Sequence, residues 1–224
     1  MRTLILLAAW VLVVFGRAAS PYGTAIDVST PLDFITLQNL RLDMYTKIYV
    51  RAFDTNSASF DKSMVTTIKS AYVTRFSVEL FMSPNLGSSV SPGDQVKSIA
   101  TGVSENLIHA DGLWIEVSQT ASKWSADIAK NREFLHTLLN TANQLNFKKI
   151  GIFTSSDDWK MVTGNTLEFA SMGLKLWYYS GDSNGNFDDF VAFGGWKAAD
   201  VKQTVLNQNV DGAKVNLDYY KFSQ

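Results

Sequence analysis

The chain has 224 residues and a formal net charge of −1, so it lacks the basic field that binding to nucleic acid or anionic lipid requires. It contains no cysteine, which excludes disulfides and thiolate metal sites. The two histidines, His109 and His136, lie too far apart in sequence to predict a helix-borne zinc motif or a serine triad. We therefore expect neither a metal nor a cofactor.

The N-terminal segment is typical of a secretory signal peptide. Arg2 precedes an apolar run over residues 4–15, and small residues follow up to Ala18. The run is shorter than the roughly 20 residues needed to span a bilayer, so we expect no membrane anchor. The sequence predicts a signal peptide over residues 1–18 and a mature domain over residues 19–224. This mature chain would be secreted, or held in the lumen of the secretory or lysosomal pathway.

Short β-rich runs alternate with helical stretches along the mature chain, which is typical of parallel strands joined by helical crossovers. Eight such runs in about 200 residues predict an α/β fold, a short (β/α) TIM-like barrel forming a single monomeric domain. The predicted strands cover residues 25–28, 47–53, 76–81, 112–117, 149–153, 174–179, 201–205 and 214–219.

Helix signals separate these strands. The clearest helix covers residues 126–145 behind a Ser125 cap. Pro92 opens another through about residue 106, and Ser155 caps a short helix carrying Trp159. Beyond residue 180 the crossovers shrink to turns, so we expect the last strands to pair without full helices between them. The apolar stripe predicted to pack the long helix on the core is Ile128, Leu135, Leu138, Leu139, Ala142 and Leu145.

Acidic and amide residues fall on several predicted strands. Asp27 ends the first strand, Glu116 lies on the fourth, Asn216 and Asp218 lie on the last, and Glu79 lies on the third. Catalytic groups of (β/α) barrels sit at the C-terminal ends of strands. The sequence therefore makes these residues the candidates for an active site.

The strand that carries Glu116 places Ser118 on the same face, because side chains alternate along a strand and residues two apart are separated by about 6.6–6.8 Å. A glycosidase with Asp-x-Glu on such a strand aims two carboxyl groups at one sugar, one of them as proton donor. Here the pattern reads Glu-Val-Ser, so a hydroxyl occupies the second position.

Several segments, in their order along the chain, carry a family resemblance. They are residues 22–29 (YGTAIDVS), 113–116 (LWIE), 150–156 (IGIFTSS) with Trp159, 176–178 (LWY), 193–196 (FGGW), 202–203 (KQ) and 215–220 (VNLDYY). Together they resemble the family 25 glycoside hydrolases, specifically their nematode and amoeba-type lysozymes. That family cleaves the β-1,4 link after N-acetylmuramic acid in peptidoglycan, with acids on the first, fourth and last strands of a short barrel. The branch usually carries cysteines, and this chain has none. It also usually has a tyrosine after the Lys-Gln pair, where this chain has Thr204.

The resemblance assigns roles position by position. Asp27 matches the first-strand aspartate, and Glu116 stands where the family has the aspartate of Asp-x-Glu. Ser118 replaces the proton-donor glutamate, Asn216 replaces the last-strand aspartate, and Asp218 stands where asparagine is usual. A serine hydroxyl cannot protonate a leaving glycosidic oxygen near neutral pH, and general acid catalysis is typically worth about 10²–10⁴-fold. The resemblance therefore implies a protein of innate defence or bacterial digestion that binds peptidoglycan with weak or lost catalysis.

The sugar-binding groove is expected to use aromatic and polar side chains at or just after strand ends. The candidates are Glu79, Trp177, Tyr178, Trp196, Gln203, Asp218 and Tyr219.

Two alternatives stay open. One is an active, drifted muramidase that uses Asp27 and Glu116. The other is a chitinase-like lectin for amino sugars, because residues 111–118 distantly resemble the Asp-Gly-x-Asp-x-Asp-x-Glu strand of chitinases. A carboxylate reaching Ser118 from a neighbouring loop would favour catalysis, and the residues to check are Asp111, Asp182 and Asp218.

Overall fold

The computed structural model describes residues 20–222. The predicted signal peptide lies outside the described residues. Within that range, none of the helices has the length and apolar character needed to cross a bilayer.

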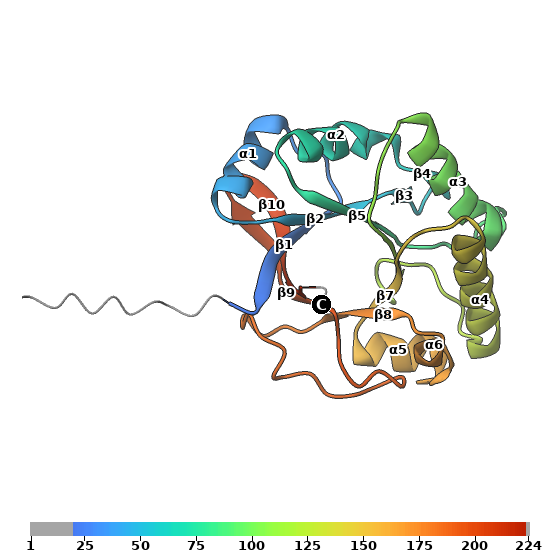
Figure 1. Cartoon of the computed structure of the whole chain (residues 1–224). Helices are drawn as coiled ribbons and strands as arrows, with labels where there is room; N and C mark the ends of the chain where they lie inside the picture. The colour runs from blue at the N-terminus through green and yellow to red at the C-terminus, as the bar shows by residue number, and fades with distance from the viewer. Residues whose placement is uncertain (1–19, 223–224) are drawn as a thin grey trace, which may run out of the picture.

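Eight strands close into a barrel in the order β1-β10-β9-β8-β7-β6-β5-β2, which confirms the predicted α/β barrel (Figure 1). The strands are β1 Tyr22–Val28, β2 Lys47–Arg51, β5 Ser77–Met82, β6 Leu113–Val117, β7 Ile150–Thr154, β8 Lys175–Tyr179, β9 Val201–Val210 and β10 Ala213–Lys221. All neighbours pair in parallel except β10, which is antiparallel to both β9 and β1. The last two strands thus form a hairpin without a helix, as predicted. A small separate hairpin joins β3 Phe53–Asp54 to β4 Ser59–Phe60.

Helices cover the outer side of the barrel from α1 round to α6, and loops cover the side after β8 (Figure 1). They are α1 Phe34–Leu42, the 3-10 turn η1 Lys62–Met64, α2 Val65–Val73, α3 Pro92–Glu105, α4 Ile128–Gln144, α5 Ser156–Thr163 and α6 Glu168–Ser171. Ser155 caps α5 as predicted. The predicted Ser125 cap of α4 is wrong, because the Asp127 side chain accepts from the Ala129 and Lys130 amides and the helix starts after it.

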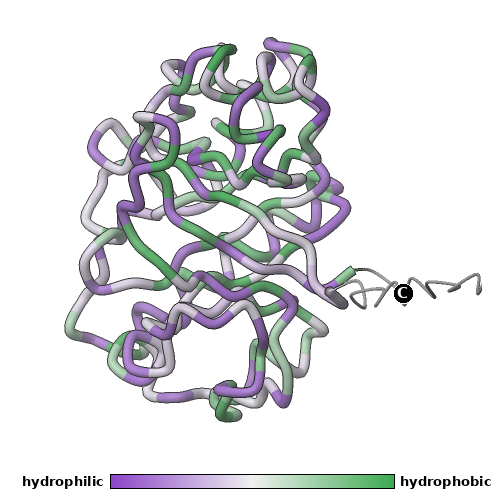
Figure 2. The backbone as a smooth tube through the Cα atoms, turned by 90° about the vertical axis from the view of Figure 1, so that its left-hand side faces the viewer, coloured by the Kyte–Doolittle hydropathy of each residue, from purple (hydrophilic) through white to green (hydrophobic). Residues whose placement is uncertain are grey.

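The buried face of α4 follows the predicted stripe in its middle turns. Leu135, Leu138, Leu139 and Ala142 are buried there. The prediction is wrong for Ile128 and Leu145, which are 39% and 38% exposed because they lie at the two ends of the helix. Within residues 20–222, hydrophilic and hydrophobic residues are interspersed along the elements, as expected where one face packs in the core (Figure 2).

Truncation of the central α4 leucine should be costly. We expect Leu138→Ala to lower the free energy of unfolding by roughly 2–5 kcal/mol, because it opens a cavity at a fully buried position. Chemical denaturation measures this loss, and Asn140→Ala on the exposed face of the same helix serves as control. A change below about 0.5 kcal/mol would show that the leucine does not pack in the core.

Aromatic side chains fill the middle of the barrel. Tyr49, Phe81, Trp114, Phe153 and Trp177 form one buried cluster together with two small aliphatic residues. The rings of Phe153 and Trp177 stack with centroids 3.9 Å apart, and the other rings meet them at steeper angles. This aromatic layer separates a pocket at the carboxyl ends of the parallel strands from a second cavity at their amino ends.

Candidate functional site

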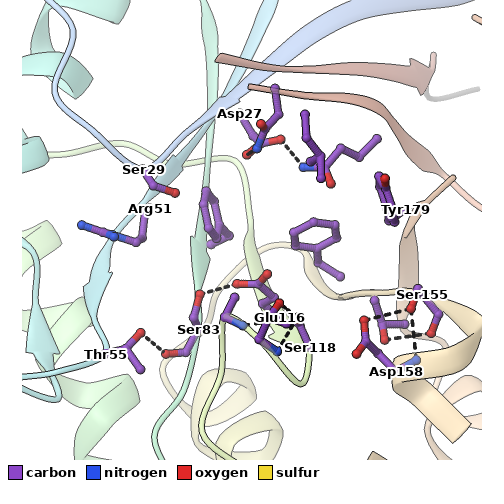
Figure 3. A pocket seen from close by; sticks show the side chains of 18 residues that line it. Asp27, Ser29, Arg51, Thr55, Ser83, Glu116, Ser118, Ser155, Asp158 and Tyr179 are labelled. Atoms are coloured by element: carbon purple, nitrogen blue, oxygen red, sulfur yellow. Dashed lines mark hydrogen bonds between the residues drawn. The ribbon is translucent and has the colours of Figure 1, made fainter. Parts of the chain in front are cut away.

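A cavity of about 460 Å³ lies at the carboxyl ends of the parallel barrel strands (Figure 3). Five of the residues singled out in the sequence line it: Asp27, Glu116, Ser118, Gln203 and Asn216. They come from four strands and one strand-end loop. The barrel closure therefore brings together the positions that the sequence placed at strand ends.

Asp27 lies at one side of the cavity and is buried. Its carboxylate accepts hydrogen bonds from Gln203 Nε2 at 2.6 Å and Asn216 Nδ2 at 2.8 Å. Burial raises the pKa of Asp27 from 3.8 to about 6, although the two amide hydrogen bonds partly offset that rise. Asn216 thus holds the first-strand acid in place and supplies no charge of its own.

Asp218 lies one step deeper in the barrel than Asn216, level with Ala25 below Asp27. Trp177 Nε1 donates to its Oδ1 at 2.9 Å, and its Oδ2 has no hydrogen-bond donor among the described residues. Burial, together with the negative charge of Asp27, raises the pKa of Asp218 well above its ordinary value. Of these two buried carboxyl groups, Asp218 therefore holds its proton more tightly than an aspartate in solvent does.

Glu116 is the second acid of the cavity and is also buried. The Ser83 hydroxyl donates to its Oε2 (Figure 3). Burial raises the pKa of Glu116 from 4.5 to about 7, and the charges of Asp27 and Asp158 add to that rise. The Ser83 hydrogen bond and the Arg51 charge act in the opposite direction. Near neutral pH about half of the Glu116 carboxyl groups carry a proton.

Ser118 follows β6 and stabilises the next turn. Its Oγ lies 3.1 Å from Thr120 Oγ1 and accepts from the amides of Thr120 at 3.3 Å and Ala121 at 3.4 Å. The hydroxyl at the position that the resemblance assigns to the proton donor is thus part of a local turn.

None of the carboxylates proposed as substitutes reaches Ser118. Asp111 accepts from Ser77 at the amino end of β5, Asp182 pairs with Lys202, and Asp218 is buried below Asp27. The acid that sequence reasoning missed is Asp158, which lines the same cavity. Its Oδ1 accepts from the Gln119 amide at 2.9 Å and its Oδ2 from Ser155 Oγ at 2.8 Å. Both oxygens are engaged, so Asp158 anchors the loop after β6 to the start of α5.

Four predicted stacking residues do not line the cavity, so that prediction is wrong. Trp177 is enclosed in the barrel centre, and Tyr178 points outward to Phe190, donating its hydroxyl to Asp189. Trp196 is buried against Trp159, and Tyr219 packs on the outer core. The rings in the cavity wall are instead Phe81, Phe153 and Tyr179.

Glu79 was also predicted to bind substrate, and this is wrong. Its fully buried carboxylate lies at the amino ends of the strands, where Lys47, Lys149 and the Trp114 indole donate to it. Burial alone would raise the pKa of Glu79, but the two ammonium groups leave it below its usual value. Glu79 is therefore separated from the cavity by the aromatic layer.

Lys202 precedes the site residue Gln203 on β9 and faces outward. Its buried ammonium group pairs with Asp182 and with Asp189, the latter at 2.7 Å, and donates to the Asn186 carbonyl at 3.0 Å. This network fixes the long connection between β8 and β9 against the strand that supplies Gln203.

Arg51 is a further cavity residue that sequence reasoning missed. Its Nη2 and Nε lie 2.8 Å and 3.3 Å from the same oxygen of Asp61. Its Nη1 has no hydrogen-bond partner among the described residues. Of the described residues that line the cavity, Arg51 alone carries a positive charge, beside Asp27, Glu116 and Asp158. Nothing in its sequence context distinguished Arg51 from other strand-end cations. Within residues 20–222, no group of three or more acids or histidines has the geometry of a metal site.

A family model described as Lysozyme-like protein 1 matches residues 18–204 of this chain. Lysozyme-like protein 1 of Caenorhabditis elegans is 32% identical over 207 residues, which cover 89% of this chain and 68% of that protein. A probable GH family 25 lysozyme of Dictyostelium discoideum, lysozyme 5, is 27% identical over 99% of this chain and its own full length.

Solved structures share the fold at lower identity. The muramidase from Trichobolus zukalii has a TM-score of 0.69 at 16% identity and covers 90% of this chain and 94% of its own. The muramidase from Acremonium alcalophilum has a TM-score of 0.70 at 14% identity, with the same coverage. The matching barrel, the family model and the two groups of relatives agree, and the chain belongs to the lysozyme-like branch of the family 25 glycoside hydrolases.

Proposed function

We propose that this protein binds bacterial peptidoglycan in the cavity at the carboxyl ends of its strands and hydrolyses it at least about 100-fold more slowly than family members with intact acids. The observation that carries the proposal is the Ser118 position. It holds a turn-forming hydroxyl, and Asp158, an acid of α5 that lines the same cavity, already accepts hydrogen bonds through both oxygens. The cavity retains carboxyl, amide and aromatic groups that can contact a glycan, and position 118 has no carboxyl group to donate a proton.

The cavity offers suitable groups for an amino-sugar chain. Tyr179 is 39% exposed and presents a ring face beside Phe81 and Phe153, which suits the apolar faces of pyranose rings. Gln203 and Asn216 hold the Asp27 carboxylate, which can accept from sugar hydroxyl or amide groups.

One observation favours the drifted muramidase as a second candidate. Glu116 has a pKa of about 7 and Asp27 a pKa of about 6, so near neutral pH a protonated carboxyl can lie beside an ionised one. Glycosidases use such a pair, with one carboxyl group as general acid and the other as nucleophile or general base. Against it, Glu116 lies about 6.6–6.8 Å further down the strand than position 118, and one extra methylene does not cover that step.

Arg51 supports peptidoglycan over chitin as the ligand. N-acetylmuramic acid carries a lactyl group that ends in a carboxylate or an attached peptide, and chitin has no acidic group. The free Nη1 of Arg51 and the second hydrogen of Nη2 are charged donors in an otherwise acidic cavity. A neutral polymer can offer such a cation only hydroxyl and amide oxygens, whereas a carboxylate-bearing chain adds the attraction of an opposite charge and a bidentate acceptor.

Arg51→Gln should therefore weaken binding selectively. We expect affinity for un-crosslinked glycan chains with free lactyl or peptide carboxylates to fall about tenfold or more, since hydrogen bonds to charged groups contribute roughly 1.5–3 kcal/mol. Binding to chitin oligosaccharides should change less than about twofold. Titration calorimetry with both ligands measures the difference.

The control is Arg75→Gln, which removes an exposed arginine at the amino end of β5. Equal losses for both polymers on Arg51→Gln would contradict a role in carboxylate recognition. Tighter binding of chitin than of peptidoglycan by the unmodified chain would favour the chitinase-like lectin.

We further propose that the protein is secreted and acts on bacterial walls in defence or digestion. The apolar run over residues 4–15 and the small residues that follow it support export. N-terminal sequencing of material from the culture medium should find a start at or near Ala19. An intact Met1 on secreted protein would count against cleavage there.

A further inference from the structure

A second cavity, of about 890 Å³, opens at the amino ends of the barrel strands. It is larger than the cavity around Asp27, and the aromatic layer of the barrel lies between the two. Its wall includes the side chains of Lys47, Lys149, Lys175 and Lys221. Lys47 begins β2, Lys149 precedes β7, Lys175 begins β8 and Lys221 ends β10. These lysines are far apart in sequence, so only the closed barrel brings them together.

Two of these lysines share one carboxylate oxygen. Lys47 Nζ lies 2.6 Å and Lys149 Nζ 2.7 Å from the same oxygen, Oε1 of Glu79, and the other oxygen of Glu79 accepts from Trp114. Glu79 carries one negative charge, so this pair keeps one uncompensated positive charge. Like charges held this close repel in a partly buried site, and a second anion between them would remove that cost.

The remaining charges at the opening do not supply that anion. Lys175 pairs with Asp200 at 2.9 Å, and Asp111 accepts from Ser77 at the rim. Lys221 has its ammonium group over the Phe187 ring at 4.6 Å and makes no ion pair among the described residues. The four lysines therefore outnumber the three nearby acids, Glu79, Asp200 and Asp111, and the cavity keeps a net positive charge.

The cavity also has a flat aromatic wall. The Tyr220 ring lies 4.5 Å from Lys47 Nζ, and its hydroxyl is fixed by Thr46 Oγ1 at 2.8 Å. Trp114 lies at the inner end of the same cavity, fully buried. Lys47 lies over this ring and Gly23 lies against it, so a sugar or aryl ring would meet the edge of Tyr220 while its anionic group reaches the two ammonium groups.

We propose that this amino-end cavity is a binding site for a small phosphate monoester carried on a sugar or aromatic ring, with the phosphate between Lys47 and Lys149. Glu79 is the positioning residue that holds both ammonium groups on one side of the ligand. A doubly charged phosphate fits this cavity better than a single carboxylate does, because Lys221, which makes no ion pair among the described residues, adds to the uncompensated charge beside Glu79. The site is independent of the peptidoglycan cavity.

The test titrates the mature chain with inorganic phosphate and with glucose 6-phosphate. Binding is measured by calorimetry and by broadening of the ³¹P resonance, and chloride at equal ionic strength is the blank. We expect saturable binding of both probes, tighter for glucose 6-phosphate. Lys47→Met with Lys149→Met should weaken binding at least tenfold. Lys214→Met, an exposed lysine elsewhere on β10, should leave it unchanged.

Loss of both lysines also strips Glu79 of its partners, so Lys221→Gln provides a second variant that leaves Glu79 untouched. It should weaken binding by at least threefold while the melting temperature stays constant. No saturable binding by the unmodified chain, or equal affinity in all variants, would overturn the proposal. Peptidoglycan binding should be the same in every one of these variants.

Discussion

Rebuilding the family's acids is expected to raise muropeptide release by at least about 100-fold, the lower bound for restoring a positioned general acid. The change is Ser118→Glu, Glu116→Asp and Asn216→Asp, together with Asp218→Asn. Ser118→Glu supplies the proton donor, and Glu116→Asp restores the shorter acid beside it. Asn216→Asp returns a charge that can stabilise an oxocarbenium-like state.

The structure explains why Asp218→Asn belongs in this set. The charge of Asp27 already raises the pKa of the buried Asp218, and Asn216 donates to Asp27. A new carboxylate at position 216 without removal of the one at 218 would place three buried acids together and raise their pKa values further. The paired exchange keeps the number of acids constant and moves one from the barrel interior to the cavity wall.

The matched control carries Ser118→Gln in place of Ser118→Glu within the same set. Glutamine has the same side-chain length as glutamate but no dissociable proton. Muropeptide release by this control variant should therefore stay at the level of the unmodified chain. Chromatography with mass detection of the released muropeptides measures both. Equal activity of the two sets would show that the missing proton donor is not what limits turnover.

The free energy of unfolding is expected to fall as pH rises from about 4.5 to about 7, because Asp27, Glu116 and Asp218 have raised pKa values in the folded state. A raised folded-state pKa means that the folded protein binds the proton more tightly than the unfolded chain. The stabilisation is complete below the unfolded-state pKa and is lost as pH climbs through the folded-state pKa. Asp27 and Glu116 each contribute on the order of 3 kcal/mol, at 1.36 kcal/mol per pKa unit.

Urea denaturation at a series of pH values measures this slope. Glu116→Gln and Asp27→Asn should each flatten it, because an amide cannot titrate. At more acidic pH the trend should reverse, since Glu79 has a lowered pKa and its ion pairs with Lys47 and Lys149 are lost on protonation. A flat profile between pH 4.5 and 7 would contradict the burial of these acids.

The barrel was predictable from the sequence because its strands are short apolar runs at regular spacing, and Asp27 and Glu116 could be placed at strand ends for the same reason. The face of each residue was harder to assign. Trp177, Tyr178 and Tyr179 are consecutive aromatics on β8, and only strand pairing decides that Trp177 fills the barrel and Tyr179 reaches the cavity. A shift of one residue reverses that assignment.

Residues that act from neighbouring elements were missed for a different reason. Asp158 is recognisable as a helix-capping residue, but its contact with the Gln119 amide depends on the packing of α5 against the loop after β6. Arg51 and Glu79 both lie on parallel strands, but Arg51 lines the cavity at their carboxyl ends, whereas Glu79, wrongly predicted to bind substrate, is buried beside Lys47 and Lys149 at their amino ends. The sequence shows both charged residues, but the stagger of the strands along the barrel axis decides which end of the barrel each side chain reaches.

The most direct test of the central claim is muropeptide release by the unmodified mature chain from defined peptidoglycan, measured beside its binding to the same material. We predict saturable binding with release at least about 100-fold below that of a family 25 muramidase with intact acids, the minimum loss for an absent general acid. Release comparable to that enzyme, abolished by Glu116→Gln, would contradict the account and establish the drifted muramidase instead.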